Sequence, residues 1–217
     1  MNKKKLLIFD LDGTLINTVK DLNIATNYAL EKLGYPLRTV KNTTDDIGNG
    51  VAKLIERSIP NGINNKDYPD CLAIFKEYYK AHYFENSFPY EGVTETLNKL
   101  KEKGYKLAVV SNKFDEGAKK LIYFYFPNIF DAVQGAIPTL KNKPSSDLVN
   151  KVLSELCVAN KDALYIGDTN VDYETATNSN LDCVLVSYGY RSKEYLLGVT
   201  KNSPIIDSIS ELLDLLD

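Results

Sequence analysis

Two aspartates stand one residue apart at the end of the first apolar run of the chain. They are Asp10 and Asp12, and Gly13 follows them directly. Open α/β sheets bind ligands at the carboxyl ends of their strands, so this position favours a functional site over a simple turn cap. An EF-hand calcium loop is excluded, because it requires Gly at its sixth position and Glu at its twelfth, where this chain has Leu15 and Asp21. Alternate side chains of an extended chain lie on one side, so both aspartates are expected to reach one ligand.

Polar side chains also follow two later apolar runs. Ser111, Asn112 and Lys113 end the second run, and Asp168 and Asp172 follow the fourth. We expect Asp172 to lie in the first turn of the next helix. Each group by itself is also typical of a helix cap, because Ser, Asn and Asp are preferred there.

A lysine stands between these groups in the sequence. Lys143 precedes Pro144, and proline is favoured at the first position of a helix. We therefore expect a helix to begin at Pro144, with Lys143 just ahead of it.

The elements that must position these residues form an alternating pattern. Short aliphatic or β-branched runs alternate with helical patterns, which predicts a doubly wound α/β fold with a parallel sheet covered on both faces. The predicted strands are Lys5 to Phe9, Lys106 to Val110, Asp131 to Gln134, Ala163 to Ile166, Cys183 to Val186 and Pro204 to Ile206.

The first two of these strands are too far apart in sequence for a single crossover helix. Between them the apolar positions have helical spacing, for example Val19, Leu22, Ala25 and Ala29. Segments rich in Pro and Gly interrupt this pattern and mark the return to the sheet. We predict an α/β core of residues 1–16 and 89–217, with a small α-helical cap of residues 17–88 inserted after the first strand.

A parallel sheet brings the carboxyl ends of its strands to one edge, so the acids, Ser111 and Lys143 are expected to converge. Clustered carboxylates repel one another unless a cation lies among them, and hard oxygen ligands favour Mg²⁺. Such a site would bind a phosphoryl group, whose transfer depends mainly on positioning and charge neutralisation. A carboxylate can then act as nucleophile and form an acyl phosphate.

Composition and charge exclude several other classes of function. The 217 residues are 44% hydrophobic and 25% charged, with a net charge of -3, which is typical of a globular protein with a real core. This balance predicts no nucleic-acid partner and no membrane partner. The chain has one histidine, His82, and no tryptophan, so a Ser-His-Asp triad would depend entirely on His82.

Cysteine usage and the amino-terminal segment indicate the compartment. Cys71, Cys157 and Cys183 are odd in number and far apart, so they predict neither a disulfide framework nor a thiolate zinc site. The first apolar run is broken by Asp10, so it is too short for a signal peptide or a membrane span. We expect a cytoplasmic protein that is a monomer or a homodimer.

Taken together, the motifs resemble the signature of the haloacid dehalogenase superfamily. That signature is Asp-x-Asp-Gly-Thr after strand one, Ser or Thr ending strand two, a Lys, and Gly-Asp-x-x-x-Asp after strand four. Here these motifs are Asp10 to Thr14, Ser111, Lys143 and Gly167 to Asp172.

A narrower resemblance is to the phosphoglycolate phosphatase group of that superfamily. It rests on the helical cap, on Val110 to Lys113, and on the segments Pro89 to Val93 and Tyr188 to Arg191. One departure is Ser146, which stands where the second Pro of a Lys-Pro-x-Pro run is common.

The resemblance implies a role for each motif residue. Asp10 would be the nucleophile, and Asp12 would protonate the leaving oxygen and then activate water. Mg²⁺ would be held by the Asp10 carboxylate, the Asp12 backbone carbonyl and Asp168. Lys143 would orient Asp10, and Asp172 would support Lys143 or a water on the metal.

Substrate contacts are implied in the same way. Gly13, Ser111, Asn112 and Lys143 would bind the phosphoryl group. The cap would close over the site and contact the organic part of the substrate, which favours small substrates. Its candidate contacts are Gly48, Asn49 and Gly50, for which a plain loop between cap helices is the alternative.

The implied activity is Mg²⁺-dependent hydrolysis of a small phosphorylated metabolite, with 2-phosphoglycolate as the first candidate. A phosphomutase of the same fold is the main alternative, because it also uses an aspartyl phosphate and a helical cap. A dehalogenase fits less well, since it needs neither a metal nor a second acid at Asp12. A non-enzymatic phospho-receiver is a further alternative, but it would not need the helical insert.

Overall fold

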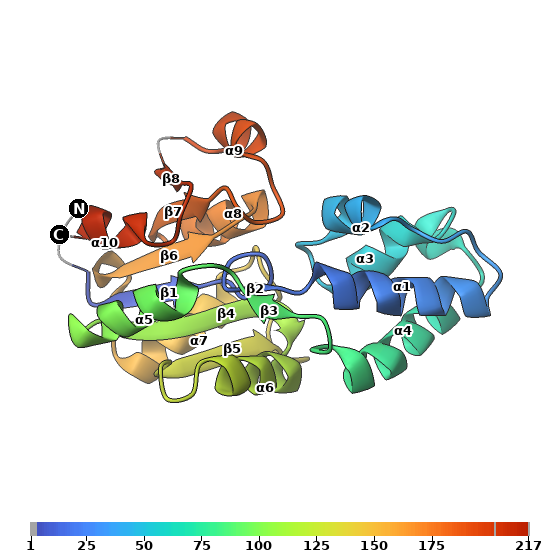
Figure 1. Ribbon diagram of the computed structural model, residues 1–217, viewed down its shortest axis with the longest axis horizontal. Helices are drawn as coiled ribbons and strands as arrows, with labels where there is room; N and C mark the ends of the chain where they lie inside the picture. Colours follow the sequence, from blue (N-terminus) through green and yellow to red (C-terminus); the bar gives the residue numbers. More distant parts are fainter. Residues whose placement is uncertain (1–3, 202, 217) are drawn as a thin grey trace. The chain divides into compact units, whose positions relative to one another are not determined.

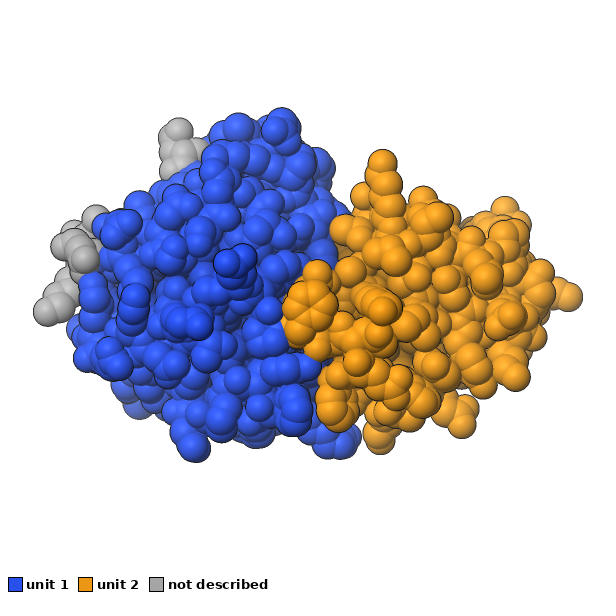
Figure 2. Space-filling view, viewed as in Figure 1, with its two compact units in different colours: residues 1–16, 89–217 blue, residues 17–88 orange. Residues whose placement is uncertain are grey.

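The computed structural model describes residues 4–201 and 203–216, and these residues divide into two compact units. One unit comprises residues 1–16 and 89–217, and the other residues 17–88 (Figure 2). Among the described residues, none of the helices combines the length and the apolar character needed to cross a membrane.

The larger unit is built on a six-stranded parallel sheet in the order β5-β4-β1-β6-β7-β8 (Figure 1). Its strands are β1 (Leu6–Phe9), β4 (Lys106–Phe114), β5 (Ala132–Ala136), β6 (Ala163–Gly167), β7 (Asp182–Val186) and β8 (Ile205–Ile206). The predicted doubly wound fold class is confirmed. Every predicted strand is present, although β4 extends four residues beyond the predicted end at Val110.

Helices cover both faces of this sheet. They are α5 (Val93–Glu102), α6 (Asp115–Tyr125), α7 (Asp147–Leu156), the 3-10 turn η2 (Asn160–Asp162), α8 (Asn170–Asn178), α9 (Lys193–Val199) and α10 (Glu211–Leu216). On one face, apolar side chains of α7 and α8 pack against the central strands, and the residues include Leu6, Ile8, Val110, Val149, Val152, Tyr165 and Ala176. Helices α5 and α6 lie on the opposite face (Figure 1).

The predicted helix start at Pro144 is wrong. Helix α7 begins at Asp147, three residues later. The Ser145 N–H donates to the Asn142 carbonyl at 3.0 Å, which closes a turn over Pro144. The Asp147 carboxylate then accepts bonds from the Ser145 hydroxyl at 2.6 Å and the Lys141 N–H at 3.1 Å. Because the turn occupies residues 142–145, the helix cannot start at the proline.

The smaller unit is helical, and it contains α1 (Val19–Lys32), α2 (Val40–Asp46), α3 (Val51–Ser58), the 3-10 turn η1 (Gly62–Asn64) and α4 (Tyr68–His82). Its core is formed by apolar side chains of α1, α3 and α4, including Leu22, Ala25, Ala29, Leu54, Ile55, Cys71 and Phe75. Two short strands that the sequence patterns do not predict, β2 (Ile16–Asn17) and β3 (Phe88–Pro89), pair where the chain passes between the units.

Candidate active site

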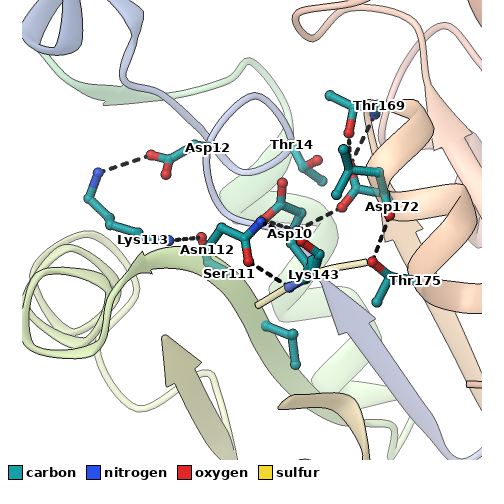
Figure 3. Close-up of polar contacts among 12 residues, drawn as sticks. Asp10, Asp12, Thr14, Ser111, Asn112, Lys113, Lys143, Thr169, Asp172 and Thr175 are labelled. Carbon is teal, nitrogen blue, oxygen red and sulfur yellow. Dashed lines mark hydrogen bonds and ion pairs between the residues drawn. The ribbon is translucent and has the colours of Figure 1, made fainter. Parts of the chain in front are cut away.

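Asp10 and Asp12 follow β1, but the chain does not stay extended through both of them. The Asp10 N–H still donates to the Ile166 carbonyl of β6 at 2.8 Å. The Leu11 carbonyl then accepts bonds from the N–H groups of Leu15 and Ile16, both at 3.0 Å, so the chain turns. The premise of an extended chain is therefore wrong beyond Asp10. Asp12 instead points toward Lys113 (Figure 3), and the two atoms of their ion pair are 3.1 Å apart.

Lys143 lies between two buried carboxylates. Its Nζ is 2.8 Å from Asp10 Oδ1 and 2.8 Å from Asp172 Oδ1. Burial alone would lower the pKa of Lys143, but the Asp10 and Asp172 charges outweigh it and hold that pKa well above its usual value. Lys143 is therefore a permanent cation at the carboxyl edge of the sheet.

Asp172 both caps helix α8 and supports Lys143. Its Oδ2 accepts bonds from the N–H groups of Asp168 and Thr169, at 3.2 and 3.0 Å, and from the Thr169 hydroxyl at 2.8 Å. Its Oδ1 faces Lys143. Any side chain at Gly167 would collide with Asp172. From the sequence, a helix cap and a functional site are alternative roles for Asp172. In the structure Asp172 has both roles.

Asp168 is fully buried and is held by neutral donors. Its Oδ1 accepts from the Thr14 hydroxyl at 3.1 Å, and its Oδ2 from the Tyr190 N–H at 2.8 Å. Gly13 has a φ of 94° and lies against this carboxylate, where a Cβ would collide with Asp168 and Tyr190. Glycine is required here by both its conformation and this close approach.

The acids are arranged as a cation site would need. One carboxylate oxygen from each of Asp10, Asp168 and Asp172 lies within 4.8 Å of the others. Burial is the main cause that raises the pKa of Asp10 to about 7 and that of Asp168 well above its usual value, and neighbouring carboxylates raise both further. Asp10 Oδ1 is buried and has no hydrogen bond within the described residues, and its contact with Lys143 is an ion pair at 2.8 Å. Because Asp172 accepts from four close donors and faces the Tyr165 hydroxyl as a fifth at 3.3 Å, Asp10 and Asp168 are the carboxylates that fit a divalent metal.

The end of β4 supplies three neighbouring side chains to the same edge. The Ser111 Oγ is buried and accepts from the Lys113 N–H at 3.1 Å. The Asn112 amide bonds the main chain of Lys143 on both sides, accepting from its N–H at 2.8 Å and donating to its carbonyl at 3.1 Å (Figure 3). These two bonds fix the main chain of Lys143, although no helix begins at Pro144.

The structure thus brings the predicted residues of the core into one cluster and adds three more. Lys113 pairs with Asp12, Thr14 bonds Asp168, and the Tyr190 backbone bonds Asp168. The sequence pattern already placed Lys113 at this edge but gave it no role, and Thr14 stands within the predicted motif of Asp10 to Thr14. The contribution of Tyr190 is a backbone N–H, which residue type does not reveal.

The predicted cap contacts lie in the other unit. Gly48, Asn49 and Gly50 form the loop between α2 and α3, where Asn49 Oδ1 accepts from Arg57 at 2.9 Å. Their role in substrate binding stays a prediction.

A parallel sheet with a buried lysine among aspartates at its carboxyl edge is suited to binding a phosphoryl group. Comparisons with known proteins identify the class of protein. The family model of haloacid dehalogenase-like hydrolases matches residues 7–186. The phosphoglycolate phosphatase of Aquifex aeolicus is 35% identical, with 86% of each chain covered. The phosphoglycolate phosphatase of Nitrosococcus oceani is 30% identical, and the match covers 100% of this chain and 98% of the relative.

A solved structure extends this likeness to the fold. A crystal structure from Lactobacillus delbrueckii subsp. bulgaricus, assigned provisionally as a phosphoglycolate phosphatase, has a TM-score of 0.93 and 31% identity, and covers 99% of this chain and 98% of its own. The chain belongs to the haloacid dehalogenase-like hydrolases. Within them it is a phosphatase of the phosphoglycolate phosphatase-like group.

Proposed function

We propose that the protein hydrolyses a small phosphorylated metabolite through a phosphoryl group carried on Asp10, with Mg²⁺ as cofactor. The observation that carries this proposal is the position of Asp10, a buried carboxylate at the end of β1 whose Oδ1 faces Lys143 at 2.8 Å. A carboxylate held beside a fixed cation is an oriented nucleophile, and the cation offsets the charge of the incoming phosphate.

In the first step an Asp10 oxygen attacks phosphorus and the bond from phosphorus to the ester oxygen breaks. The leaving oxygen takes a proton from Asp12, which yields the free alcohol of the product. For this transfer the Asp12 carboxyl must turn away from Lys113, to which it is paired at 3.1 Å. Proton donation by a positioned acid is worth roughly 10²- to 10⁴-fold in rate.

In the second step water attacks the phosphorus of the aspartyl phosphate. Asp12, now ionised, takes a proton from that water, and the bond between phosphorus and Asp10 breaks. Inorganic phosphate leaves, and both aspartates return to their starting states. The same residue therefore acts first as acid and then as base.

The remaining side chains bind and orient the phosphoryl group. Ser111 Oγ accepts a backbone bond from Lys113, so its own hydrogen is available to a phosphoryl oxygen. Asn112 is proposed to act mainly by fixing the Lys143 main chain. Gly13 permits the close approach of the loop to Asp168.

Mg²⁺ would be held by the carboxylates of Asp10 and Asp168, with the Asp12 carbonyl as a third ligand. When bound it supplies charge neutralisation for the phosphoryl oxygens. Thr14 and the Tyr190 N–H hold Asp168 in place for this purpose.

The substrate is proposed to be 2-phosphoglycolate, because the curated relatives are named for that activity. A panel of phosphorylated metabolites at equal concentration tests this proposal, with phosphate release as the measurement. The highest kcat/KM is expected for 2-phosphoglycolate, and a higher value for another compound would reassign the substrate.

Metal dependence is tested on the same protein. Stringent chelation should abolish phosphate release, and Mg²⁺ should restore it, whereas Ca²⁺, with its larger and looser coordination, should not. Full activity after chelation would contradict the metal proposal. Return of the phosphoryl group to an organic product, instead of its release as phosphate, would indicate the phosphomutase alternative.

A further inference from the structure

Tyr165 of β6 is a fully buried tyrosine that the proposed chemistry leaves unexplained. Its ring belongs to the apolar cluster between the sheet and helices α7 and α8, which includes Ile8, Val110 and Val152. A phenylalanine would fill that space equally well. The hydroxyl needs a reason of its own, because a buried hydroxyl costs free energy unless it is hydrogen-bonded.

The hydroxyl has polar neighbours from three separate segments of the chain. It accepts a bond from Lys143 Nζ at 3.2 Å. It can donate its one hydrogen to the Val110 carbonyl or to Asp172 Oδ1, both at 3.3 Å. Burial raises the pKa of Tyr165 well above its usual value, so this hydrogen is retained. The three segments are the ones that carry Ser111, Lys143 and Asp172.

Lys143 Nζ donates hydrogen bonds to the neutral Tyr165 hydroxyl at 3.2 Å and to Asp172 Oδ1 at 2.8 Å. Asp10 Oδ1 lies 2.8 Å from the same nitrogen as an ion pair. If the hydroxyl were removed, one buried N–H would lose its acceptor, and Lys143 could shift between the two carboxylates.

We propose that Tyr165 is a positioning residue whose hydroxyl holds the Lys143 ammonium beside Asp10. This inference rests on the proposed function of Asp10 and Lys143. Tyr165 acts on the reaction only through Lys143, and the Tyr165 ring serves the core independently of that role. Positioning of this kind affects the rate of the bound complex more than substrate binding.

The first test compares Tyr165→Phe with the wild type, using p-nitrophenyl phosphate and Mg²⁺. Because the ring and its packing are kept, kcat should fall about tenfold while KM stays within about twofold. The matched control is Tyr105→Phe, which removes a hydroxyl of the same unit that bonds the Leu216 carbonyl at 3.4 Å. The control should leave kcat unchanged. An unchanged kcat in Tyr165→Phe would overturn the proposal.

The second test measures urea unfolding of Tyr165→Phe, Lys143→Met and the double variant. Tyr165→Phe should lower the unfolding midpoint in the wild-type background, where Lys143 loses an acceptor. It should lower the midpoint less in the Lys143→Met background, where no ammonium remains and only the bond that the hydroxyl donates is lost. An equal loss in both backgrounds would show that the hydroxyl serves only the core, and would overturn the proposal.

The two tests separate this inference from the proposed function. If Asp10→Asn still turns over substrate, the aspartyl-phosphate mechanism fails, but the unfolding cycle still reports the coupling of Tyr165 to Lys143. If Asp10→Asn is inactive and Tyr165→Phe has normal kcat, only the assignment of Tyr165 fails.

Discussion

Two aspartates, one in each unit, are almost equally buried but have opposite surroundings. Asp21 in α1 is 3% exposed, and Asp10 at the end of β1 is 7% exposed. Asp21 accepts four hydrogen bonds, at 2.7 to 3.0 Å, from the backbone and side chain of Asn86 and the hydroxyl of Ser87. Asp10 Oδ1 has the Lys143 charge nearby but no hydrogen bond within the described residues.

This difference shows how a buried charge can be used. The Asp21 carboxylate is satisfied on both oxygens, so it fastens the end of the helical unit to its first helix. The Asp10 carboxylate keeps an oxygen that is not committed to a hydrogen bond, which is what a nucleophile or metal ligand needs. Burial alone does not identify a functional acid; incomplete hydrogen bonding beside a fixed cation does.

The largest expected effect is that of Asp10→Asn. The amide keeps the shape of the side chain but is a poor nucleophile, so turnover should fall at least about 10⁴-fold. A phosphoenzyme, trapped by acid quench after incubation with ³²P-labelled substrate, should be absent. Labelled protein in the Asp10→Asn variant would show that another residue accepts the phosphoryl group.

The next effect is that of Asp12→Asn, which should reduce kcat for an alkyl phosphate by roughly 10²- to 10⁴-fold. With p-nitrophenyl phosphate, whose leaving group needs little protonation, the first step should survive and the second should slow. A burst of p-nitrophenol with accumulation of phosphoenzyme is therefore expected in rapid-mixing experiments. Near-normal turnover of the alkyl phosphate would contradict the assignment of Asp12.

Asp21→Asn should change stability and leave catalysis intact. Its amide replaces one acceptor oxygen with a donor and cannot satisfy all three donor groups, so the free energy of unfolding should fall by about 2–3 kcal/mol in urea titrations. Assayed well below its unfolding temperature, the variant should keep kcat within about twofold of the wild type. A large loss of kcat in the folded variant would show that Asp21, like Asp10, affects catalysis.

The smallest effect concerns the pH dependence of stability in metal-free protein. The pKa of Asp10 is raised from 3.8 to about 7, chiefly by burial. Between these values the folded state holds a proton that the unfolded state has lost, so this group makes the free energy of unfolding fall as pH rises.

The measurement is urea unfolding of chelated wild type and chelated Asp10→Asn from pH 4 to 8. The wild type should lose stability relative to the variant as pH rises toward about 7. Parallel curves for the two proteins would show that Asp10 does not titrate in this range.

Much of this architecture follows from the order of residues. The alternation of apolar runs predicted every strand of the sheet, because parallel strands buried on both faces need continuous aliphatic sequence. The acids, Ser111 and Lys143 could be grouped from their positions in the chain, since the carboxyl ends of parallel strands share one edge. The motif spacing also indicated the family.

Two other features did not follow from these patterns, and only the second depended on contacts between distant segments. The start of α7 at Asp147 was missed because a local turn and the Asp147 side chain outweigh the helical preference of Pro144. Lys143 is placed instead by Asn112, which lies far from it in sequence. Hydrogen bonds of this kind depend on the packing of whole elements, which local patterns do not encode.

Residue types and spacing alone determined that this chain folds as a parallel α/β sheet with clustered acids and a lysine at one edge, because strand periodicity and strand-end chemistry are local properties. Only the tertiary structure decided which aspartate keeps an oxygen available as a nucleophile or metal ligand. Asp172 faces five donors, Asp12 is paired with Lys113, and Asp10 keeps an oxygen without a hydrogen bond. That distinction arises from burial and from partners brought together by folding, and these set the hydrogen bonding and charge of each carboxylate.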